Sequence, residues 1–522
     1  MKRKPMVVSM RGIVACVLLT GILLPVSPKM PLIPAEYFVD DIMAEEGDCT
    51  QGNPCYLATA LAKSAPATIY LAAGTYTGTG NEVIYLSTHF NLFGGWDGTT
   101  AYPPVHDPDT YVSIIDGENA RRGISIIWSS GDPLSPVITG LIIEKGDATG
   151  KATGCLILSS GTPDGCGGGI YVSQATPFIH NNVIHNNKAS TSISNTGYGG
   201  GIYMQYSNGA QIIENRIYSN VASQNSQGLG GGVALHEGGV NTEFDHNLVY
   251  QNNGGCSSGK SCWGAGLALA GDSSHIFENE IYDNGISDTV YVSGGGIYLW
   301  YGSPVIENNL ITGNYGDAAV YLGYTSNARF RSNRILNNSS DAGLELIYTQ
   351  KAGATCTDTD NVYVYNNFIS GENESNLFAT GSPDYPLCAR VYHNTLDGAQ
   401  KGVVLDTMFD FIFVNNIISN HSTIGIDVST AANTPVLSHN LFYNNSNNGL
   451  VGLSDLFGDP HYINPVTNNF HIWCDSAAVD KGDSAIDVGI DIDGETRPIG
   501  SGSDIGADEC SPMFYLPLIK RN

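Results

Sequence analysis

Short runs in which apolar and polar residues alternate follow one another along most of the chain. Alternation with a period of two is typical of β-strands, and Val, Ile, Phe and Tyr, which favour strands, dominate these runs. Between residues 160 and 450, no repeat contains the long apolar stripe of a helix. The pattern therefore predicts a protein built almost entirely from short strands.

The runs belong to a repeat with two recognisable halves. One half reads Gly-Gly-Gly-Ile-Tyr, at residues 167–171, 199–203 and 294–298. The other half reads apolar-x-x-Asn-x-Ile, and its Asn recurs every 22 to 34 residues. Such a period indicates a solenoid, without the regular Leu of leucine-rich repeats or the longer unit of propellers. The aligned residues are Asn182, Asn215, Asn247, Asn279, Asn309, Asn333, Asn367, Asn394, Asn416 and Asn440.

The repeated Asn has a structural explanation. A coil of strands turns sharply between one strand and the next, and Asn tolerates the left-handed backbone of such a turn. In successive coils the Asn side chains lie over one another, so their amides can hydrogen-bond along the axis. We therefore expect the Asn series to stabilise a coil of parallel strands rather than to carry chemistry.

Composition narrows the class further. Gly accounts for 63 of 522 residues and charged residues for only 14%, with a formal net charge of −27. Apolar residues, at 42%, exclude a disordered chain, and the Gly residues lack the period of three that collagen requires. The acidic balance argues against nucleic acid as a partner, because a polyanion is repelled.

Both ends of the chain resemble targeting segments. Residues 1–35 begin with basic residues and continue with an apolar run, Gly12 to Val26, that is short for a membrane span. This order is typical of an export signal, with a retained membrane anchor as the alternative. The tail, residues 511–522, is apolar and then basic, and is either a sorting signal or a strand that covers the last coil. We expect a secreted or cell-surface protein without a transmembrane span after signal cleavage.

The cysteines fit an exported protein. Apart from Cys16 in the signal, ten cysteines fall into pairs of neighbours along the sequence. An even count with local pairing predicts disulfides, and no CxxC pair or nearby His supports metal binding. The predicted pairs are Cys49/Cys55, Cys155/Cys166, Cys256/Cys262, Cys356/Cys388 and Cys474/Cys510.

The N-terminal part adds a resemblance to a known family. Near the start of residues 36–99 stands Tyr-Phe-Val-Asp-Asp, from Tyr37 on, and we expect a short capping helix within residues 56–65. Together with the repeats, this part resembles the right-handed parallel β-helix family of pectate lyase and its relatives. The resemblance implies an all-β fold, a right-handed parallel β-helix solenoid, with an N-terminal cap and first coils over residues 36–150 and repeats over residues 151–456.

Residues 457–510 resemble a module found at the end of many exported β-helices, called choice-of-anchor Q. The shared marks are Gly-Asp-Pro at 458, Phe-His-Ile at 470, Ala-Val-Asp-Lys-Gly-Asp at 478 and Asp-Ile-Gly-Ala-Asp-Glu at 504. We expect this segment to form an acidic capping module. Because the β-helix fold hosts lyases, hydrolases, epimerases and adhesins, the resemblance predicts the fold and leaves the activity open.

Candidate binding residues come from the outward positions of the Gly-Gly-Gly-Ile-Tyr strand. If Ile points into the coil, the following Tyr points out, so stacked repeats build an aromatic face. Aromatic rings offer flat apolar surfaces on which sugar rings stack. A cross-coil stack that only stabilises the sheet is the alternative. The candidates are Tyr171, Tyr203, Tyr298, Trp300, Tyr301 and Tyr321.

Two pairs of residues are candidates for catalysis. Hydrolysis of a glycosidic bond uses two carboxyl groups about 5 to 10 Å apart, and Asp406 and Asp427 on adjacent coils are one such pair. A lyase requires a basic residue beside a calcium-bound uronate, and Arg329 and Arg331 alternate on one strand face. The Gly-His-Gly and Arg-x-Lys motifs of polygalacturonases do not occur. Solvated charges are the alternative for the arginines.

Calcium is the cofactor that the acidic module suits. Residues 475–509 hold ten acidic and two basic residues, and Ca²⁺ prefers hard oxygen ligands. A solvated acidic cap with Asp in its turns is the alternative. The candidate ligands are Asp491, Asp493, Glu495 and Asp504.

The sequence thus predicts an exported β-helix that binds polysaccharide through its aromatic face, without catalysis. A lyase or glycoside hydrolase that uses the same groove is the second hypothesis. A structural surface protein without a glycan ligand is the third.

Overall fold

The computed structural model describes residues 34–41, 46–151, 154–155, 163–255, 260–285, 291–349, 356–382, 384–407, 409–428 and 434–511. The predicted export signal lies outside these ranges except for its last two residues, and so does the tail beyond Ser511. All elements below belong to the unit that begins at Ala35. In the described ranges, no helix has the length and apolar character that a membrane span requires.

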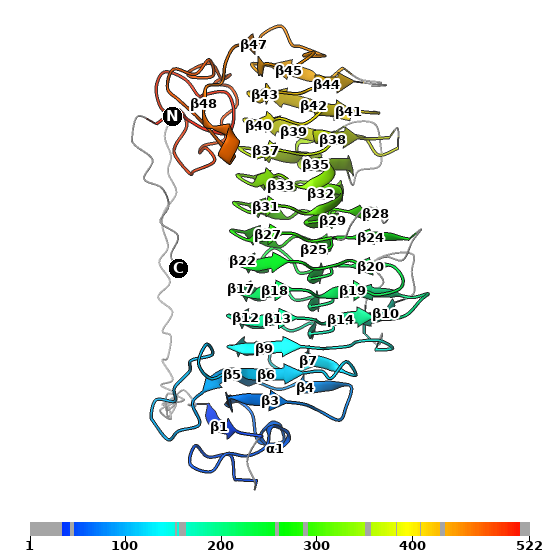
Figure 1. Ribbon diagram of the computed structural model, residues 1–522, viewed down its shortest axis with the longest axis vertical. Coiled ribbons are helices and arrows are strands. Elements are labelled where there is room, and N and C mark those ends of the chain that lie inside the picture. The colour runs from blue at the N-terminus through cyan, green and yellow to red at the C-terminus, as the bar shows by residue number, and fades with distance from the viewer. Residues whose placement is uncertain are drawn as a thin grey trace, which may run out of the picture. The chain divides into compact units, whose positions relative to one another are not determined.

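The chain winds into a coil whose turns each contribute one strand to each of three long parallel sheets (Figure 1). Strands pair in register with the equivalent strand of the next coil, as Ile170 does with Ile202 and Ile179 with Ile212. The fold is therefore the right-handed parallel β-helix that the sequence predicts. We call the three sheets I, II and III in the order in which the chain passes through them.

Sheet I contains the Gly-Gly-Gly-Ile-Tyr strands. Its members are β4 (Glu82–Leu86), β7 (Arg122–Ile127), β11 (Ile170–Ser173), β16 (Ile202–Gln205), β21 (Val233–His236), β25 (Leu267–Asp272), β29 (Ile297–Gly302), β32 (Tyr315–Thr325), β35 (Ser339–Thr349), β38 (Ser375–Thr380), β41 (Lys401–Leu405) and β44 (Ile424–Val428).

Sheet II precedes the Asn of each repeat. Its members are β1 (Ala35–Val39), β2 (Ala67–Ala72), β5 (Phe90–Trp96), β8 (Val137–Thr139), β12 (Phe178–His180), β17 (Gln211–Ile213), β22 (Glu243–Asp245), β26 (His275–Phe277), β30 (Val305–Glu307), β33 (Arg329–Arg331), β36 (Val362–Tyr365), β39 (Leu387–Tyr392), β42 (Phe409–Val414) and β45 (Val436–Ser438).

Sheet III follows the Asn. Its members are β3 (Gly74–Tyr76), β6 (Ser113–Asp116), β9 (Leu141–Glu144), β13 (Val183–His185), β18 (Arg216–Tyr218), β23 (Leu248–Tyr250), β27 (Glu280–Tyr282), β31 (Leu310–Thr312), β34 (Arg334–Leu336), β37 (Phe368–Ser370), β40 (Thr395–Asp397), β43 (Ile417–Ser419), β46 (Leu441–Tyr443) and β47 (Leu456–Phe457).

The predicted stacking of the Asn amides is confirmed. The backbone N–H and the Nδ2 of Asn182 both donate to Oδ1 of Asn215, at 3.0 and 3.1 Å. The series continues coil by coil to Asn440, which donates to Asp455. The left-handed backbone belongs to the residue before each Asn, such as Glu214 with φ 56°, and not to the Asn itself.

A second Asn ladder, which the sequence analysis did not identify, follows sheet III. Asn187 donates to Asn220 in the same way, at 3.0 Å. This ladder ends where Asn338 donates to the buried carboxyl group of Glu372. Its members are Asn187, Asn220, Asn252, Asn284, Asn314 and Asn338.

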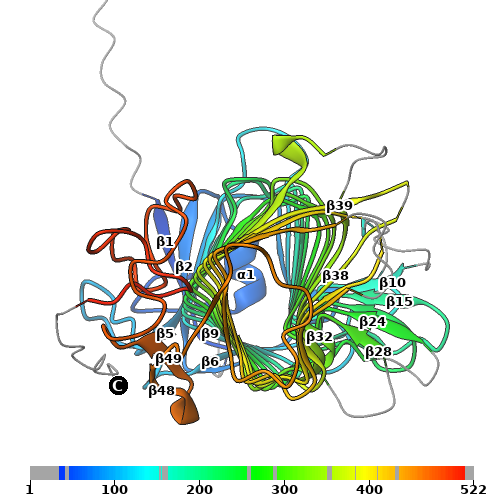
Figure 2. The same ribbon diagram turned by 90° about the horizontal axis from the view of Figure 1, so that it is seen from above.

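Two further elements lie outside the three long sheets (Figure 2). The helix α1 (Leu57–Leu61) buries Leu57 and Ala60 in the main core at the N-terminal end, within the expected residues 56–65. Beside sheet I projects a five-stranded side sheet. The side sheet consists of β10 (Pro163–Cys166), β15 (Thr196–Tyr198), β20 (Gly228–Leu229), β24 (Ser261–Trp263) and β28 (Tyr291–Ser293), next to the pair β14 (Lys188–Ser190) and β19 (Val221–Ser223).

The C-terminal module packs against the outer face of sheet III. Phe470 and Ile492 contact Leu336 and Phe368, which belong to β34 and β37. The module thus lies along the side of the last coils in addition to following them (Figure 1). Its elements are η2 (Pro465–Thr467) and the antiparallel strands β48 (Tyr462–Asn464) and β49 (Asn469–Ile472), while η1 (Asp358–Asp360) precedes β36.

The described residues contain four of the five predicted disulfides. Cys262 is also disulfide-bonded, and Cys256, its predicted partner, lies outside the described residues. The four are Cys49–Cys55, Cys155–Cys166, Cys356–Cys388 and Cys474–Cys510.

Candidate functional site

The aromatic face predicted from the sequence is closed over much of its length. Tyr171 on β11 and Tyr203 on β16 stack in the predicted register, with ring centroids 5.9 Å apart. Their exposed fractions are only 2% and 0%, and Tyr298 on β29 is 6% exposed. The prediction that these three rings present their faces to a sugar is therefore wrong.

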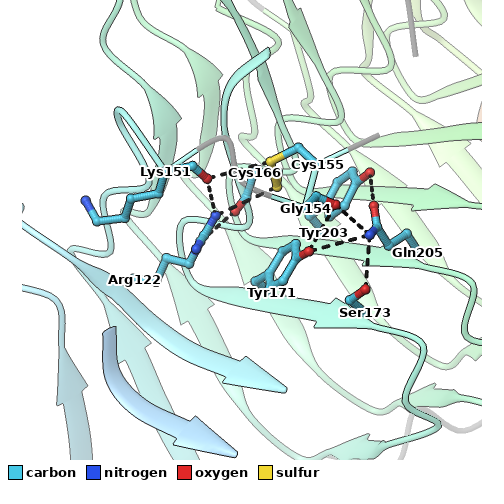
Figure 3. Close-up of a disulfide and its surroundings, with 9 residues drawn as sticks. All are labelled: Arg122, Lys151, Gly154, Cys155, Cys166, Tyr171, Ser173, Tyr203 and Gln205. Atoms are coloured by element: carbon cyan, nitrogen blue, oxygen red, sulfur yellow. Dashed lines mark hydrogen bonds between the residues drawn. A yellow bond between two sulfur atoms is a disulfide. The ribbon is translucent and has the colours of Figure 1, made fainter. Parts of the chain in front are cut away.

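The rings are covered by loops that protrude beside sheet I (Figure 3). One such loop is closed by the Cys155–Cys166 disulfide. The hydroxyl of Tyr171 donates to the carbonyl of Gly154 in this loop at 3.1 Å, and Nε2 of Gln205 donates to the same carbonyl at 2.6 Å. The tyrosines of this face thus form a second small core outside the coil. Strand periodicity predicts where a side chain points, but not what a loop places over it.

Beyond the side sheet, sheet I carries a groove of about 360 Å³, which we call the acidic groove. Six of its lining residues bear a carboxyl group and one bears an amine. The row of outward residues on sheet I runs through it, with Tyr321, Glu345 and Phe378 on successive coils. The lining residues are Asp317, Asp341, Ala342, Glu345, Glu374, Ser375, Phe378, Lys401, Val404, Asp406 and Asp427.

The predicted carboxylate pair lies in this groove. Asp406 and Asp427 both line it, and their strands are neighbours, because Val404 of β41 pairs with Asp427 of β44. An alignment of the Gly-Gly-Gly-Ile-Tyr half-motifs in the sequence misses one coil of the structure, however. Phe378 of β38 lies between Glu345 and Val404, on a strand without the Gly-Gly-Gly-Ile-Tyr half-motif.

The carboxyl groups at the N-terminal end of the groove are perturbed. Burial, reinforced by the nearby carboxylate of Asp317, raises the pKa of Glu345 to about 7. Burial also raises the pKa of Asp317, and Asp341 adds to this effect. Near neutral pH, Glu345 therefore exists partly as a carboxylic acid that can donate a hydrogen bond. At the other end, Nζ of Lys401 lies 3.2 Å from Oδ2 of Asp427.

An aromatic cluster lies at the turn that ends β29, β32 and β35 of sheet I. Tyr301, Tyr324 and Tyr348 occupy the same position on successive coils, with left-handed backbone at φ 60°, 52° and 56°. The ring centroid of Tyr324 lies 4.5 Å from that of Trp300 and 5.5 Å from that of Tyr385. Tyr301 and Tyr385 are 38% and 37% exposed. Of the predicted aromatic residues, Trp300 and Tyr301 thus belong to an open aromatic surface.

The arginines proposed for a lyase lie on another face. Arg329 and Arg331 of β33 line a groove of about 440 Å³ on sheet II. In that groove, Glu307 contacts the guanidinium group of Arg331, and its Oε1 lies 2.7 Å from Nε2 of His275. The four catalytic candidates therefore do not form one site, and the arginines cannot act in the acidic groove.

The side chains expected to bind calcium do not converge on one point. They are those of Asp491, Asp493, Glu495 and Asp504. The oxygens of Asp491 accept hydrogen bonds from three backbone N–H groups. Those of Asp504 accept two such bonds, both at 2.7 Å. These buried carboxylates hold the loop backbone. Among the described residues, the group that does converge consists of Asp493, His471 and Asp508.

Comparison with family models agrees with the fold. The family model described as "Right handed beta helix region" matches residues 257–352. No curated protein matches the chain. Similar solved structures include the periplasmic alginate epimerase AlgG, 13% identical over 75% of this chain and 82% of that chain, with a TM-score of 0.36.

Two other similar structures cover more of the chain. The complex of XylC with xylose is 10% identical over 90% of this chain and 98% of that chain, with a TM-score of 0.40. Pectate lyase Pel9A is 14% identical over 91% of this chain and 96% of that chain, with a TM-score of 0.28. At such identities and TM-scores, these likenesses carry no argument about activity or substrate.

Proposed function

We propose that the protein binds a neutral polysaccharide along sheet I, with sugar rings stacked on the aromatic cluster and sugar hydroxyls bound in the acidic groove. The observation that supports this most is the continuity of the two surfaces. Tyr321, whose ring centroid lies 6.4 Å from that of Trp300, directly precedes Glu345 in the outward row. A chain of sugars can therefore contact both surfaces at once.

The chemistry of the groove favours a ligand without acidic groups. Carboxylates accept hydrogen bonds from sugar hydroxyls, and a protonated Glu345 donates one. Six carboxyl groups against one lysine repel a uronate or a sulfate ester. Aromatic rings contribute stacking that does not depend on charge. We therefore infer a neutral glycan rather than the anionic polymer of a pectate lyase.

Export of the protein is part of the proposal. Disulfides persist in oxidising compartments, and the four in the described residues support a secreted or surface location. The predicted signal in residues 1–35 is consistent with this.

The test is a binding assay against neutral and acidic glycans with two variants. Replacing Tyr301 and Tyr385 together by Ala is expected to reduce affinity for the bound neutral glycan at least tenfold, because both stacking surfaces are lost. Tyr206→Ala is the matched control, since Tyr206 is 42% exposed and occupies the turn position of Tyr301 three coils earlier. Equal binding by the double variant and by the control would place the glycan elsewhere.

One observation favours a second function, glycoside hydrolysis. A carboxylic acid with a pKa of about 7, as at Glu345, is suited to protonate the oxygen of a glycosidic bond. A neighbouring carboxylate, such as Asp317, would then deprotonate the water that attacks the anomeric carbon. Release of new reducing ends from the bound glycan, abolished in Glu345→Gln with binding retained, would establish this function. Binding without release leaves the protein a non-catalytic binder.

A further inference from the structure

We propose that the C-terminal module holds one divalent transition-metal ion, of which Zn²⁺ is the best match, between His471, Asp493 and Asp508. One ligand atom from each of these residues lies within 4.8 Å of the others. His471 belongs to β49, whereas Asp493 and Asp508 lie in two later loops of the module. The site is separate from the acidic groove, which lies on sheet I.

The imidazole ring of His471 is oriented for metal binding. Its Nδ1 lies 2.5 Å from Oδ1 of Asn469. The same oxygen accepts the backbone N–H of His471 at 3.3 Å, so the amide oxygen faces the ring and Nδ1 carries the proton. Metal-binding histidines are usually held in this way, by a hydrogen bond from the nitrogen that does not bind the metal. The ring also packs edge-on against Phe368, with centroids 5.2 Å apart.

With Nδ1 protonated in a neutral ring, Nε2 directs its lone pair toward the carboxylates. Nε2 lies 2.7 Å from Oδ2 of Asp493. A nitrogen lone pair and a carboxylate oxygen at this distance require a cation, which is either a proton on the ring or a metal ion beside both atoms. Asp508, which is 2% exposed, adds a second carboxyl group, and a buried carboxylate is stabilised by a positive partner.

Both carboxylates are held by neighbouring donors. Nη2 of Arg334 donates to Oδ1 of Asp493 at 2.9 Å, which leaves Oδ2 facing the ring. The backbone N–H of Ile472 donates to Oδ2 of Asp508 at 2.8 Å. The three side chains are therefore oriented by the protein itself, as the ligands of a preformed metal site are.

The ligand set selects the ion. One imidazole nitrogen and two carboxylate oxygens suit Zn²⁺ and similar first-row ions, with a remaining position for water. Ca²⁺ takes oxygen ligands only, and in larger number. The module is therefore expected to bind Zn²⁺ in preference to the Ca²⁺ that its acidic sequence suggests.

The position of the site indicates what the ion does. Arg334 belongs to β34 and Phe368 to β37, so the site lies where the module contacts sheet III. An ion here ties three segments of the module together at this contact. Metal binding is thus expected to raise the unfolding temperature, because an ion that binds only the folded state stabilises it.

The test is calorimetric titration of the chelator-treated full chain with ZnCl₂ and, separately, with CaCl₂. We expect one Zn²⁺ per chain, no saturable binding of Ca²⁺, and a higher melting temperature with Zn²⁺. His471→Ala and Asp508→Asn should each weaken Zn²⁺ binding at least tenfold. His461→Ala is the matched control, because His461 forms an exposed pair with Asp475 in the same module and should leave binding unchanged.

Absence of saturable Zn²⁺ binding by the wild-type chain would overturn the proposal in favour of a protonated imidazole, and wild-type affinity in His471→Ala would overturn it by placing the ion elsewhere. Loading the wild-type chain with Co²⁺ gives a readout that requires no variant. An intense visible absorption band is expected from a site of low coordination number with an imidazole ligand. A spectrum identical to that of aqueous Co²⁺ would equally overturn the proposal, even if the variants fail to fold.

Discussion

Replacing Glu372 by Gln is expected to stabilise the protein at neutral pH and above. Glu372 is 5% exposed and ends the second Asn ladder, where Nδ2 of Asn338 donates to its Oε1 at 3.4 Å. Oγ of Ser340 lies 3.2 Å from its Oε2, to which it donates, and 2.8 Å from the carbonyl of Ala342. These donors do not offset the cost of burying a carboxylate, which a protonated carboxyl group or a Gln amide avoids.

The magnitude follows from the pKa. Burial raises the pKa of Glu372 from 4.5 to about 8. Between these values the folded state binds more protons than the unfolded state, so the free energy of unfolding falls as the pH rises through this window and levels off above it. The loss is less than about 1 kcal/mol at pH 5 and about 3 kcal/mol at pH 7. Because Gln does not titrate, the advantage of the variant should grow by roughly 2 kcal/mol between pH 5 and pH 7.

The assay is equilibrium unfolding of both proteins in guanidinium chloride at several pH values from 5 to 8. Other buried carboxyl groups titrate in the same window, so the quantity of interest is the difference between variant and wild type at each pH. Glu374→Gln is the control, because its side chain is 54% exposed and the same substitution there removes a carboxylate that is not buried. A Glu372→Gln difference that stays constant with pH would refute the assignment of a protonated carboxyl group.

Other predictions concern the ladder and the covered tyrosines. Asn279→Ala should lower the free energy of unfolding by about 3 kcal/mol or more, since Nδ2 of Asn279 donates to Phe244 O at 2.9 Å and to Asn309 Oδ1 at 2.9 Å. Unfolding in denaturant measures this loss. An unchanged midpoint of the unfolding transition would mean that the ladder does not stabilise the fold. Replacing Cys155 and Cys166 together by Ser should make the tyrosines beneath their loop reactive toward nitration, as mass spectrometry would detect, and unchanged protection would show that the side sheet alone covers them.

The fold could be predicted because its strongest constraint repeats. Each Asn of the first ladder forms hydrogen bonds with the Asn residues of the coils above and below. The same residue is therefore required at every coil, and it appears as a period in the sequence. Ile170 and Ile202, which point inward at equivalent positions, carry the same information. The second ladder repeats with the same intervals, five residues after the first, but it covers fewer coils because Glu372 stands in place of Asn at its end.

The site could be predicted only in part, because it depends on contacts that do not repeat. The outward direction of Tyr171 and Tyr203 is correct, but the loops and side strands beside sheet I decide whether an outward ring is exposed. Tyr385 joins the aromatic cluster from a loop that precedes β39, and no spacing in the sequence connects it with Tyr324. The proposed metal site likewise combines His471, which lies on a strand, with Asp508, which lies in a loop near the end of the chain.

Repeat length nevertheless contains the information that locates the groove. The ladder residues Asn182 to Asn309 are spaced 33, 32, 32 and 30 residues apart, and each interval contains one strand of the side sheet. The next interval, from Asn309 to Asn333, has only 24 residues and contains none in the described chain. At this step Oγ of Ser293, on the last side strand, donates to Oδ2 of Asp317 at 3.3 Å, and Asp317 lines the acidic groove. The first shortened repeat, which lacks a side strand, thus marks where the cover of sheet I ends. The following interval, from Asn333 to Asn367, has 34 residues but no side strand in the described chain, so the loss of that strand indicates where this β-helix face becomes available to a ligand.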